Sequence, residues 1–387
     1  MNPEERLEIL GADARFESCD SFTPRRRKGP ALGPGITPTT TPDGRTLNLF
    51  RVLQSNACEW DCPYCPLRRS NDTPRVSLAP DEMAQVFMER QRVGAVQGLF
   101  LSSAVDGGLR PAMGRMLDTV ELLRTRYEYS GYVHLKLLPG ARADEVERAA
   151  KLADRVSVNL EAPNGDRLKQ IAPERRWRSI IEPMAYAWAA QQAGHLPSGQ
   201  VTQLVVGAAG ETDREIFGAT TRLYHDFRLR RVYFNAFRPQ QDTPFAQHAP
   251  TPSVRPQRLQ EADWLVRHYG FRADELPFDA DDNLPLQIDP KFAWAVAHPE
   301  QFPLEINTAP REALLRVPGI GPISVERILT MRRDLRFRDL THLQRIGVVI
   351  NKARHFVTLE GKFLGEDGAA VAARLRAKPI VEQLRLW

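Results

Sequence analysis

Short apolar runs recur between residues 46 and 237, and a stretch with helical spacing follows most of them. The runs predict strands at residues 47–53, 98–103, 132–138, 155–160, 201–207 and 231–237. Apolar positions three or four residues apart predict helices at residues 80–92, 116–126, 144–152, 180–192 and 212–227. Alternating strands and helices form parallel sheets, so we predict an α/β domain of six repeats with its ligands at the carboxyl ends of the strands.

The loop after the first predicted strand holds three of the four cysteines in the chain. Cys58, Cys62 and Cys65 are spaced CxxxCxxC, whereas Cys19 lies far upstream in a Pro- and Arg-rich segment. Thiolates this close together can bind one soft metal centre, and cysteine sulfur holds iron–sulfur clusters. A cubane has four irons, so three cysteines leave one iron with an exchangeable position. The spacing therefore predicts one [4Fe-4S] cluster with a reactive iron.

Two other interpretations of the cysteines stay open from the residues alone. Cys19 could complete a four-cysteine zinc site, although zinc ligands usually arrive as two CxxC-type pairs, which this spacing does not give. The thiols could also be close by chance. A disulfide framework is not expected, because 387 residues can bury a core without covalent staples.

Composition favours a globular protein without a membrane segment. Hydrophobic residues make up 42% of the chain and charged residues 26%, and no apolar run of about 18 residues occurs. The acidic start, from Met1 to Arg6, lacks the apolar core of a signal peptide. We therefore expect a cytoplasmic protein, a location that suits an oxygen-sensitive cluster. After a short helical pattern near Leu7, residues 1–45 read as an irregular extension with a basic run at 25–28.

The net charge of +5 is concentrated near the C-terminus. From Leu304 to Trp387 there are fifteen Lys or Arg residues and nine Asp or Glu residues, an excess of six positive charges. Nucleic acid is the usual partner of such an asymmetry, although a solvated basic face explains the charge equally well.

A second informative pattern lies within this basic region, at residues 306–328. Two helical stretches are joined by Pro318-Gly319-Ile320-Gly321, and Pro322 stands at the first position of the second helix. The N–H groups at the start of that helix would point outward for an anion. Residues 339–352 repeat the pattern, with Gly347 matching Gly319 but Val349 in the place of Gly321.

The cysteine motif, with an aromatic residue at Tyr64, resembles the signature of the radical S-adenosylmethionine (radical SAM) enzymes. In that family the open iron binds the methionine part of SAM, and an electron from the cluster cleaves SAM to a 5′-deoxyadenosyl radical. The resemblance implies a partial (βα)6 TIM-like barrel with the cluster at its top. It also implies SAM as a cofactor and an electron donor such as flavodoxin or ferredoxin.

The same resemblance suggests which strand ends meet SAM. Ser102 and Ser103 stand where many members carry a Gly-Gly-Glu run, and this chain departs from that run. Asn159 and Glu161 resemble the position that binds the ribose, and Gly207 resembles a backbone contact on the adenine side. Asn235 or Lys136 is a further candidate. The SAM contacts implied are Tyr64, Ser102, Ser103, Asn159, Glu161, Gly207 and Asn235.

Residues 306–328 resemble the helix-hairpin-helix DNA-binding family, whose contacts to the phosphate backbone are independent of sequence. The implied nucleic-acid contacts are Pro318, Gly319, Ile320, Gly321, Gly347 and Lys352. The two motifs together resemble a bacterial group of radical SAM proteins assigned to DNA modification or repair. In that comparison the second hairpin is the weaker phosphate site, because Val349 replaces a glycine.

These inferences divide the chain into five parts. They are an irregular extension (1–45), a radical SAM partial barrel (46–250), a helical bridge (251–303), a small all-α tandem helix-hairpin-helix domain (304–364) and a tail (365–387). We expect a radical SAM enzyme that modifies or repairs DNA. The alternatives are an enzyme acting on RNA, especially tRNA, or on protein, and a non-catalytic DNA-binding protein with a structural metal. Cys19 as a hydrogen-atom donor to a product radical is a further hypothesis.

Overall fold

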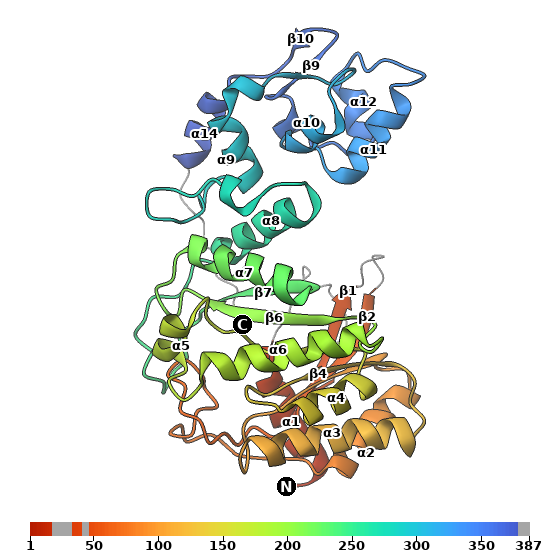
Figure 1. Cartoon of the computed structure of the whole chain (residues 1–387), viewed down its shortest axis with the longest axis vertical. Helices are drawn as coiled ribbons and strands as arrows, with labels where there is room; N and C mark the ends of the chain where they lie inside the picture. Colours follow the sequence, from red (N-terminus) through yellow and green to blue (C-terminus); the bar gives the residue numbers. More distant parts are fainter. Residues whose placement is uncertain (18–32, 41–45, 378–387) are drawn as a thin grey trace. The chain divides into compact units, whose positions relative to one another are not determined.

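The computed structural model describes residues 1–17, 33–40 and 46–377, which form two compact units. Unit 1 comprises Met1–Glu211 and Ala219–Thr251, and unit 2 comprises Thr212–Gly218 and Pro252–Trp387 (Figure 1). The predictions for Cys19 and for the basic run at 25–28 fall outside the described residues. None of the helices in the described part of the chain is long and apolar enough to cross a membrane.

Unit 1 is built on a seven-stranded sheet in which each strand pairs with the next one along the chain. The parallel strands are β2 (Thr46–Leu53), β3 (Gly98–Ser102), β4 (Tyr132–Lys136), β5 (Arg155–Ser157), β6 (Gln200–Val206) and β7 (Arg231–Ala236). The six predicted strands are therefore confirmed, in the predicted order.

The seventh strand, β1 (Ile36–Thr40), corrects the prediction of six strands. It lies in the segment that was expected to be irregular, and it pairs antiparallel with β2, Pro38 standing opposite Asn48. Pro38 argues against a strand inside a sheet because it lacks an N–H group. At the edge of a sheet that missing donor needs no partner, so the proline is tolerated there.

Helices precede and follow these strands along the chain. They are α1 (Pro3–Asp13), α2 (Pro80–Arg92), α3 (Leu109–Thr125), α4 (Ala143–Leu152), α5 (Gly165–Ile171), α6 (Trp177–Gln192) and α7 (Asp213–Phe227). Helix α2 is typical: Met83, Val86 and Phe87 fall on one face and are buried, whereas its polar face is exposed. Successive helices pack side by side, α2 on α3, α3 on α4 and α4 on α6 (Figure 1).

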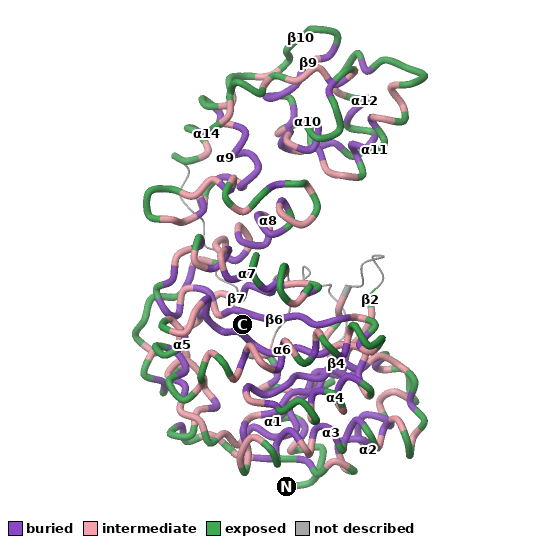
Figure 2. Tube along the Cα trace, in the orientation of Figure 1, coloured by how far each residue is buried: buried purple, intermediate pink, exposed green. Residues whose placement is uncertain are grey.

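The sheet is curled, and its concave face can be identified from one cluster of side chains. Phe100, Val201 and Tyr233 pack together in the core, although β3 neighbours neither β6 nor β7 in the sheet. Side chains from strands that are not neighbours meet only across the concave face of a curled sheet. The face that carries Phe100 is therefore the inner face of a partial barrel, and Figure 2 shows the central strands as deeply buried.

Unit 2 is mainly helical. Its helices are α8 (Val254–His268), α9 (Pro290–Ala297), α10 (Arg311–Arg316), α11 (Pro322–Met331), α12 (Leu340–Arg345), α13 (Ile350–Ala353) and α14 (Gly368–Arg376). The region that was expected to be all-α also contains a three-stranded sheet of β8 (Leu304–Glu305), β9 (Val357–Leu359) and β10 (Lys362–Phe363). Strands of two or three residues are too short for a period-two pattern, so the sequence did not reveal them. Single turns of 3₁₀ helix lie at η1 (Ala14–Glu17), η2 (Ala273–Glu275) and η3 (Pro299–Gln301).

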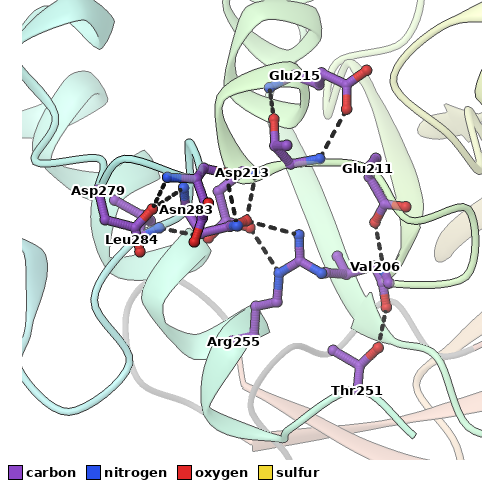
Figure 3. Close-up of polar contacts among 12 residues, drawn as sticks. Val206, Glu211, Asp213, Glu215, Thr251, Arg255, Asp279, Asn283 and Leu284 are labelled. Carbon is purple, nitrogen blue, oxygen red and sulfur yellow. Dashed lines mark hydrogen bonds and ion pairs between the residues drawn. The ribbon is translucent and has the colours of Figure 1, made fainter. Parts of the chain in front are cut away.

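A buried carboxylate ties the first turn of α7 to the rest of unit 2. Asp213 is fully buried and accepts hydrogen bonds from Arg255 Nε at 2.8 Å and from the N–H of Leu284 at 2.9 Å (Figure 3). Its own N–H donates to Asn283 Oδ1 at 3.2 Å. A carboxylate removed from water needs such donors, so this network fixes the segment Thr212–Gly218 within unit 2.

Candidate functional site

The cysteine loop follows β2 and is held by residues far away in the sequence. The N–H of Glu59 donates to the carbonyl of Val105 at 2.8 Å, in the loop after β3. The N–H of Asp61 donates to the carboxylate of Glu174, in the loop before α6. The loop therefore lies along the carboxyl ends of the strands, where the sequence places the ligands of a parallel sheet.

A buried amide anchors the start of the loop. Asn56 is fully buried, and its Nδ2 donates to Asp13 Oδ2 and to the carbonyl of Pro74, both at 2.8 Å. Its Oδ1 accepts from the N–H of Val76 at 2.7 Å. Both ends of the amide are satisfied, which links α1 to the cysteine loop.

One guanidinium group ties the loop together. Arg75 donates to the carbonyls of Asn56, Leu67 and Asn71 at 2.9 Å each, and to the carbonyl of Arg68 at 2.5 Å. These carbonyls flank the cysteines on both sides. The planar guanidinium presents several N–H donors in a fixed arrangement, which no other side chain does.

Arg75→Lys is expected to impair loading of the cluster, because one ammonium group cannot reach four carbonyls in this arrangement. We expect iron and sulfide per chain, after anaerobic reconstitution, to fall below about half of the wild-type value. Arg69→Lys is the matched control, since Arg69 lies on the same loop, is largely exposed and donates to the carbonyl of Glu59 at 2.9 Å. Equal loading of both variants would contradict a role for Arg75 in shaping the loop.

The three thiols occupy different environments on this loop. Cys62 is 4% exposed, and Cys58 and Cys65 are half-buried. Burial raises the pKa of the Cys62 and Cys65 thiols, and the neighbouring cysteines raise that of Cys65 further. The N–H of Leu67 donates to Cys65 and opposes this shift. Iron binding must therefore displace protons from thiols that otherwise stay neutral at pH 7.

The three thiols are not placed to hold a single metal ion. In residues 1–17, 33–40 and 46–377, no group of three or more His, Cys, Asp or Glu side chains is placed to hold one metal ion. Three thiolates that each bind a different iron of a cubane need not converge in that way. The donor set itself, three cysteines on one loop, fits a [4Fe-4S] cluster.

Arg175 is a cation beside the cysteine loop that the sequence analysis did not single out. It donates to Glu161 Oε1 at 2.8 Å, and its guanidinium carbon lies 5.1 Å from the centre of the Trp60 ring. Its charge also acts on Cys62 and counters part of the rise in pKa that burial causes there. Arg175 lies fourteen positions after Glu161 in the sequence, and no local pattern connects them. Only the fold could have revealed this pair.

Glu161 and Asn159 are brought together after β5, as candidates for the same ligand. Glu161 is 3% exposed and has a positive φ of 64°. Asn159 Nδ2 donates to Glu161 Oε1 at 3.2 Å, so this oxygen serves both Asn159 and Arg175. The other oxygen, Glu161 Oε2, is buried and has no hydrogen-bond partner in the described part of the chain.

Ser102, at the carboxyl end of β3, has a second unpartnered oxygen. Its side chain is fully buried, and its Oγ has no hydrogen-bond partner among the described residues. The neighbouring Ser103 differs, because its Oγ donates to the carbonyl of Ala104 at 2.9 Å. Buried polar atoms are rarely left unpaired, so Ser102 Oγ and Glu161 Oε2 fit a polar ligand such as SAM.

Gly207 has a structural reason to be glycine. It follows β6 with φ of 89°, and a Cβ there would overlap the hydroxyl of Thr251. Its N–H donates to the carboxylate of Glu211, which lies beside the end of β6 at Val206 (Figure 3). The same carboxylate also accepts from the N–H of Ala209 at 3.1 Å. The backbone contact that the sequence analysis assigned to this position could use its carbonyl, since the N–H is already engaged.

The two remaining candidates for the SAM site, Asn235 and Tyr64, are both half-buried. Asn235, near the end of β7, is half-buried and stands directly opposite Val205 of β6. Tyr64 lies on the cysteine loop, where burial raises the pKa of its hydroxyl well above the ordinary value. Its hydroxyl therefore stays protonated at neutral pH.

The first hairpin of unit 2 is packed against the second. Gly319 has φ of 83°, and a Cβ there would lie 2.5 Å from the carbonyl oxygen of Val349. The N–H of Val349 donates to the carbonyl of Gly319 at 2.9 Å. The resemblance to a helix-hairpin-helix implied a nucleic-acid contact at Gly319. In the structure it is the second hairpin that comes close, and Pro318 and Ile320 beside it are buried.

The second hairpin is more open. Gly347 is exposed, with φ of 91°, whereas Lys352 is half-buried and forms an ion pair with Asp289 at 2.9 Å. Gly321 is half-buried and is the N-cap residue of α11. Of the six residues predicted to contact nucleic acid, Gly347 is the one that is exposed.

A buried lysine, Lys291, donates a hydrogen bond to the first hairpin. Lys291 is 6% exposed, its Nζ donates to the carbonyl of Ile320 at 2.6 Å, and it lies 4.5 Å from the centre of the Tyr269 ring. Burial lowers the pKa of Lys291 to about 7, an effect that Asp289 opposes and the cations Arg316 and Lys352 reinforce. The ammonium therefore titrates close to neutral pH.

Lys291 makes the stability of unit 2 depend on pH. Between a folded pKa of about 7 and the ordinary value of 10.5, the unfolded chain binds more protons, so the free energy of unfolding rises with pH. The slope has an upper limit of about 1.4 kcal/mol per pH unit. We expect urea unfolding at pH 7 and pH 9 to show this rise in the wild type and its loss in Lys291→Met. Parallel pH profiles for the two proteins would contradict it.

The sequence comparisons find the following similarities. Residues 52–219 match the family model described as the radical SAM superfamily. GTP 3′,8-cyclase of Agrobacterium fabrum (strain C58 / ATCC 33970) is 26% identical over 183 residues, which cover 45% of this chain and 49% of the relative. GTP 3′,8-cyclase of Rhodopseudomonas palustris (strain TIE-1) is 27% identical over 165 residues, covering 41% and 44%. The chain thus spans about half the length of these curated relatives.

Solved structures that are similar include HydG, a maturase of the [FeFe]-hydrogenase. The identity is 15% and the TM-score is 0.44, and the match covers 54% of this chain and 46% of the HydG chain. A radical SAM methyltransferase from Sphaerobacter thermophilus is similar at 16% identity and a TM-score of 0.42, covering 67% of this chain and 88% of that one.

Proposed function

We propose that this chain, a member of the radical SAM superfamily, cleaves SAM reductively and uses the resulting 5′-deoxyadenosyl radical to modify or repair DNA. The observation that carries the first half is the placement of Cys58, Cys62 and Cys65 on one loop at the carboxyl ends of the strands. The two buried oxygens without partners, Ser102 Oγ and Glu161 Oε2, support it.

The residues at this site have different roles. When bound, the [4Fe-4S] cluster and SAM supply the electron-transfer and radical chemistry. The cysteine thiolates hold the cluster, and Arg75 holds the loop that carries them. Glu161 accepts hydrogen bonds from a ligand hydroxyl, and Arg175 fixes its orientation by occupying the other carboxylate oxygen.

The DNA substrate is supported by unit 2. Its residues 306–328 resemble a helix-hairpin-helix, and this stretch contains two short helices, α10 and α11, joined by a short turn. The first-turn N–H group of α11 at Ile323, an exposed residue, has no intrahelical acceptor and could meet a phosphate. Exposed cations lie beyond the same helix and on α12, at Arg333, Arg336 and Arg345.

The test is production of 5′-deoxyadenosine by anaerobically reconstituted protein with SAM and dithionite. We expect formation that duplex or single-stranded DNA stimulates. Stimulation by tRNA alone would assign the substrate to RNA instead. Zinc without iron in anaerobically purified protein, with no 5′-deoxyadenosine formed, would overturn the radical mechanism.

A variant of the exposed cations tests the DNA half separately. Replacing Arg333, Arg336 and Arg345 by Gln should weaken DNA binding. It should also flatten the dependence of binding on salt, by a slope of about 0.9 for each phosphate that the variant no longer neutralises. Formation of 5′-deoxyadenosine without DNA should not change. An unchanged DNA affinity would remove unit 2 as the binding surface.

A further inference from the structure

The strands of the partial barrel carry charge of one sign. Strands β2 to β7 contain the cations Arg51, Lys136, Arg155 and Arg231 and no Asp or Glu residue. Strands in the core of a parallel sheet are usually apolar, because charged groups lose hydration there. Four cations on these strands therefore call for a functional reason.

The register places all four cations on the inner face. One row of directly paired residues consists of Arg51, Phe100, His134 and Arg155. A second row consists of Lys136, Ser157, Val201 and Arg231. Directly paired residues point to the same face of a sheet. Phe100 and Val201 belong to the cluster that identifies the concave face, so both rows face inward.

The side-chain contacts agree with this placement. The guanidinium of Arg51 lies 5.3 Å from the centre of the Phe100 ring, and that of Arg231 lies 4.6 Å from the centre of the Tyr233 ring. Phe100 and Tyr233 belong to the inner cluster. Arg155 is turned toward the amino ends of the strands, where its Nε donates to the carbonyl of Ser198 at 3.2 Å. Arg51, Lys136 and Arg231 are therefore the candidate cations for a ligand.

A buried histidine, His134, lies close enough to these cations for their charges to lower its pKa. The pKa of His134 is lowered well below its ordinary value by burial and by the charges of Arg155, Arg51 and Lys136. The neutral imidazole forms a hydrogen bond with Ser157 Oγ at 2.9 Å. The inner face therefore favours the binding of an anion.

One anion from the chain itself already reaches this face. Glu17, in η1, forms an ion pair with Lys136, which is 8% exposed. Two carboxylates near the carboxyl ends of the strands are engaged elsewhere. Glu161 pairs with Arg175, and Glu211 accepts from backbone N–H groups. Glu17 thus shows that a carboxylate-sized anion fits against Lys136.

We propose that the inner face of the barrel binds a phosphate group of the substrate, and that Glu17 occupies the place of this phosphate at Lys136 until the substrate enters. This rests on the proposed function and gives the chemical class of its substrate, a phosphate-bearing nucleotide unit. The guanidinium groups of Arg51 and Arg231 suit phosphate because they offer paired N–H donors, and Lys136 adds a point charge.

The two sources of such a phosphate, a free nucleotide and a DNA strand, are separated by the choice of probe. Calorimetric titration of the reconstituted holoenzyme with SAM would use thymidine, thymidine 5′-monophosphate and the oligonucleotide dT8 at one salt concentration. We expect the monophosphate or dT8 to bind at least about 10-fold more tightly than thymidine, since thymidine has no phosphate for the cations to bind. Tighter binding of thymidine 5′-monophosphate would identify the bound group as a phosphate monoester, and tighter binding of dT8 would identify it as a diester.

Two substitutions with opposite expected effects make the test specific. Lys136→Gln should weaken binding of the phosphate probe about 10-fold, whereas Glu17→Gln should strengthen it several-fold by removing the competing carboxylate. Arg126→Gln, an exposed cation at the end of α3, is the control and should change neither. Circular dichroism checks that each variant is folded.

The result that would overturn the inference is equal binding of thymidine and both phosphate probes, or weaker binding after Glu17→Gln. The latter would mean that the ion pair with Lys136 is only structural. The proposed function fails by a different measurement. If 5′-deoxyadenosine forms from SAM while thymidine and its phosphate bind alike, only the phosphate site is wrong. If none forms, the radical chemistry is wrong whatever the probes show.

Discussion

Replacing Cys58, Cys62 and Cys65 together by Ala is expected to reduce both iron–sulfur content and 5′-deoxyadenosine formation to background. In the described residues these are the three cysteines present, and they share one loop. An iron–sulfur cluster needs thiolate ligands, and neighbouring carbonyl groups are too hard as ligands to replace them. The measurement is iron and sulfide per chain together with 5′-deoxyadenosine after anaerobic incubation with SAM and dithionite.

Cys19→Ala is the matched control, because it removes the fourth cysteine and leaves the CxxxCxxC loop intact. We expect unchanged cluster content and unchanged 5′-deoxyadenosine. A loss of bound zinc in this variant, with no iron in either protein, would support the alternative of a four-cysteine zinc site completed by Cys19. An altered product with normal cluster content would support Cys19 as a hydrogen-atom donor.

Gly319→Ala should give the largest loss of stability of any glycine substitution in the paired hairpins. Its φ of 83° is strained for a residue with a Cβ, and the Cβ would lie 2.5 Å from the carbonyl oxygen of Val349. That atom belongs to the backbone and cannot rotate away. We expect the free energy of unfolding of unit 2 to fall by about 2–5 kcal/mol. Urea unfolding combined with hydrogen exchange of residues 304–363 measures it.

Gly270→Ala separates the two causes. Gly270 also has a positive φ, 73°, but a Cβ there would have nothing within 4 Å. It should therefore show the conformational cost alone, about 1 kcal/mol. Similar losses in both variants would mean that the contact between the hairpins adds nothing to stability.

The parts of the fold that were predictable are those that repeat. Each parallel strand is an apolar run followed by an amphipathic helix, and burial on both sides imposes that pattern whatever else the chain does. The edge strand β1 was not predicted because it contains Pro38, and a proline argues against a strand. Proline is excluded only from strands inside a sheet, and β1 lies at the edge. The short strands β8 to β10 carry too few residues for any pattern.

The candidate site divides in the same way. The cysteines were predictable because their spacing is itself the chemical signal. Arg75 and Arg175 were not predictable. Arg75 binds carbonyl groups of an irregular loop, and Arg175 pairs with Glu161, to which no local pattern connects it. The sequence suggested that Gly319 contacts nucleic acid. In the structure, the backbone of Val349 lies beside it. A glycine pattern reports that something approaches closely and does not report what.

The long-range anchors of the cysteine loop have a consequence for biosynthesis. The loop is fixed by Asp13, before it in the sequence, and by Val105 and Glu174, after it. A ribosome that has just released Cys65 has not yet made the last two anchors. We therefore expect a cluster carrier to recognise the chain only after residue 174 has emerged and the first βα repeats have folded, so that cofactor insertion follows translation of this part of the barrel.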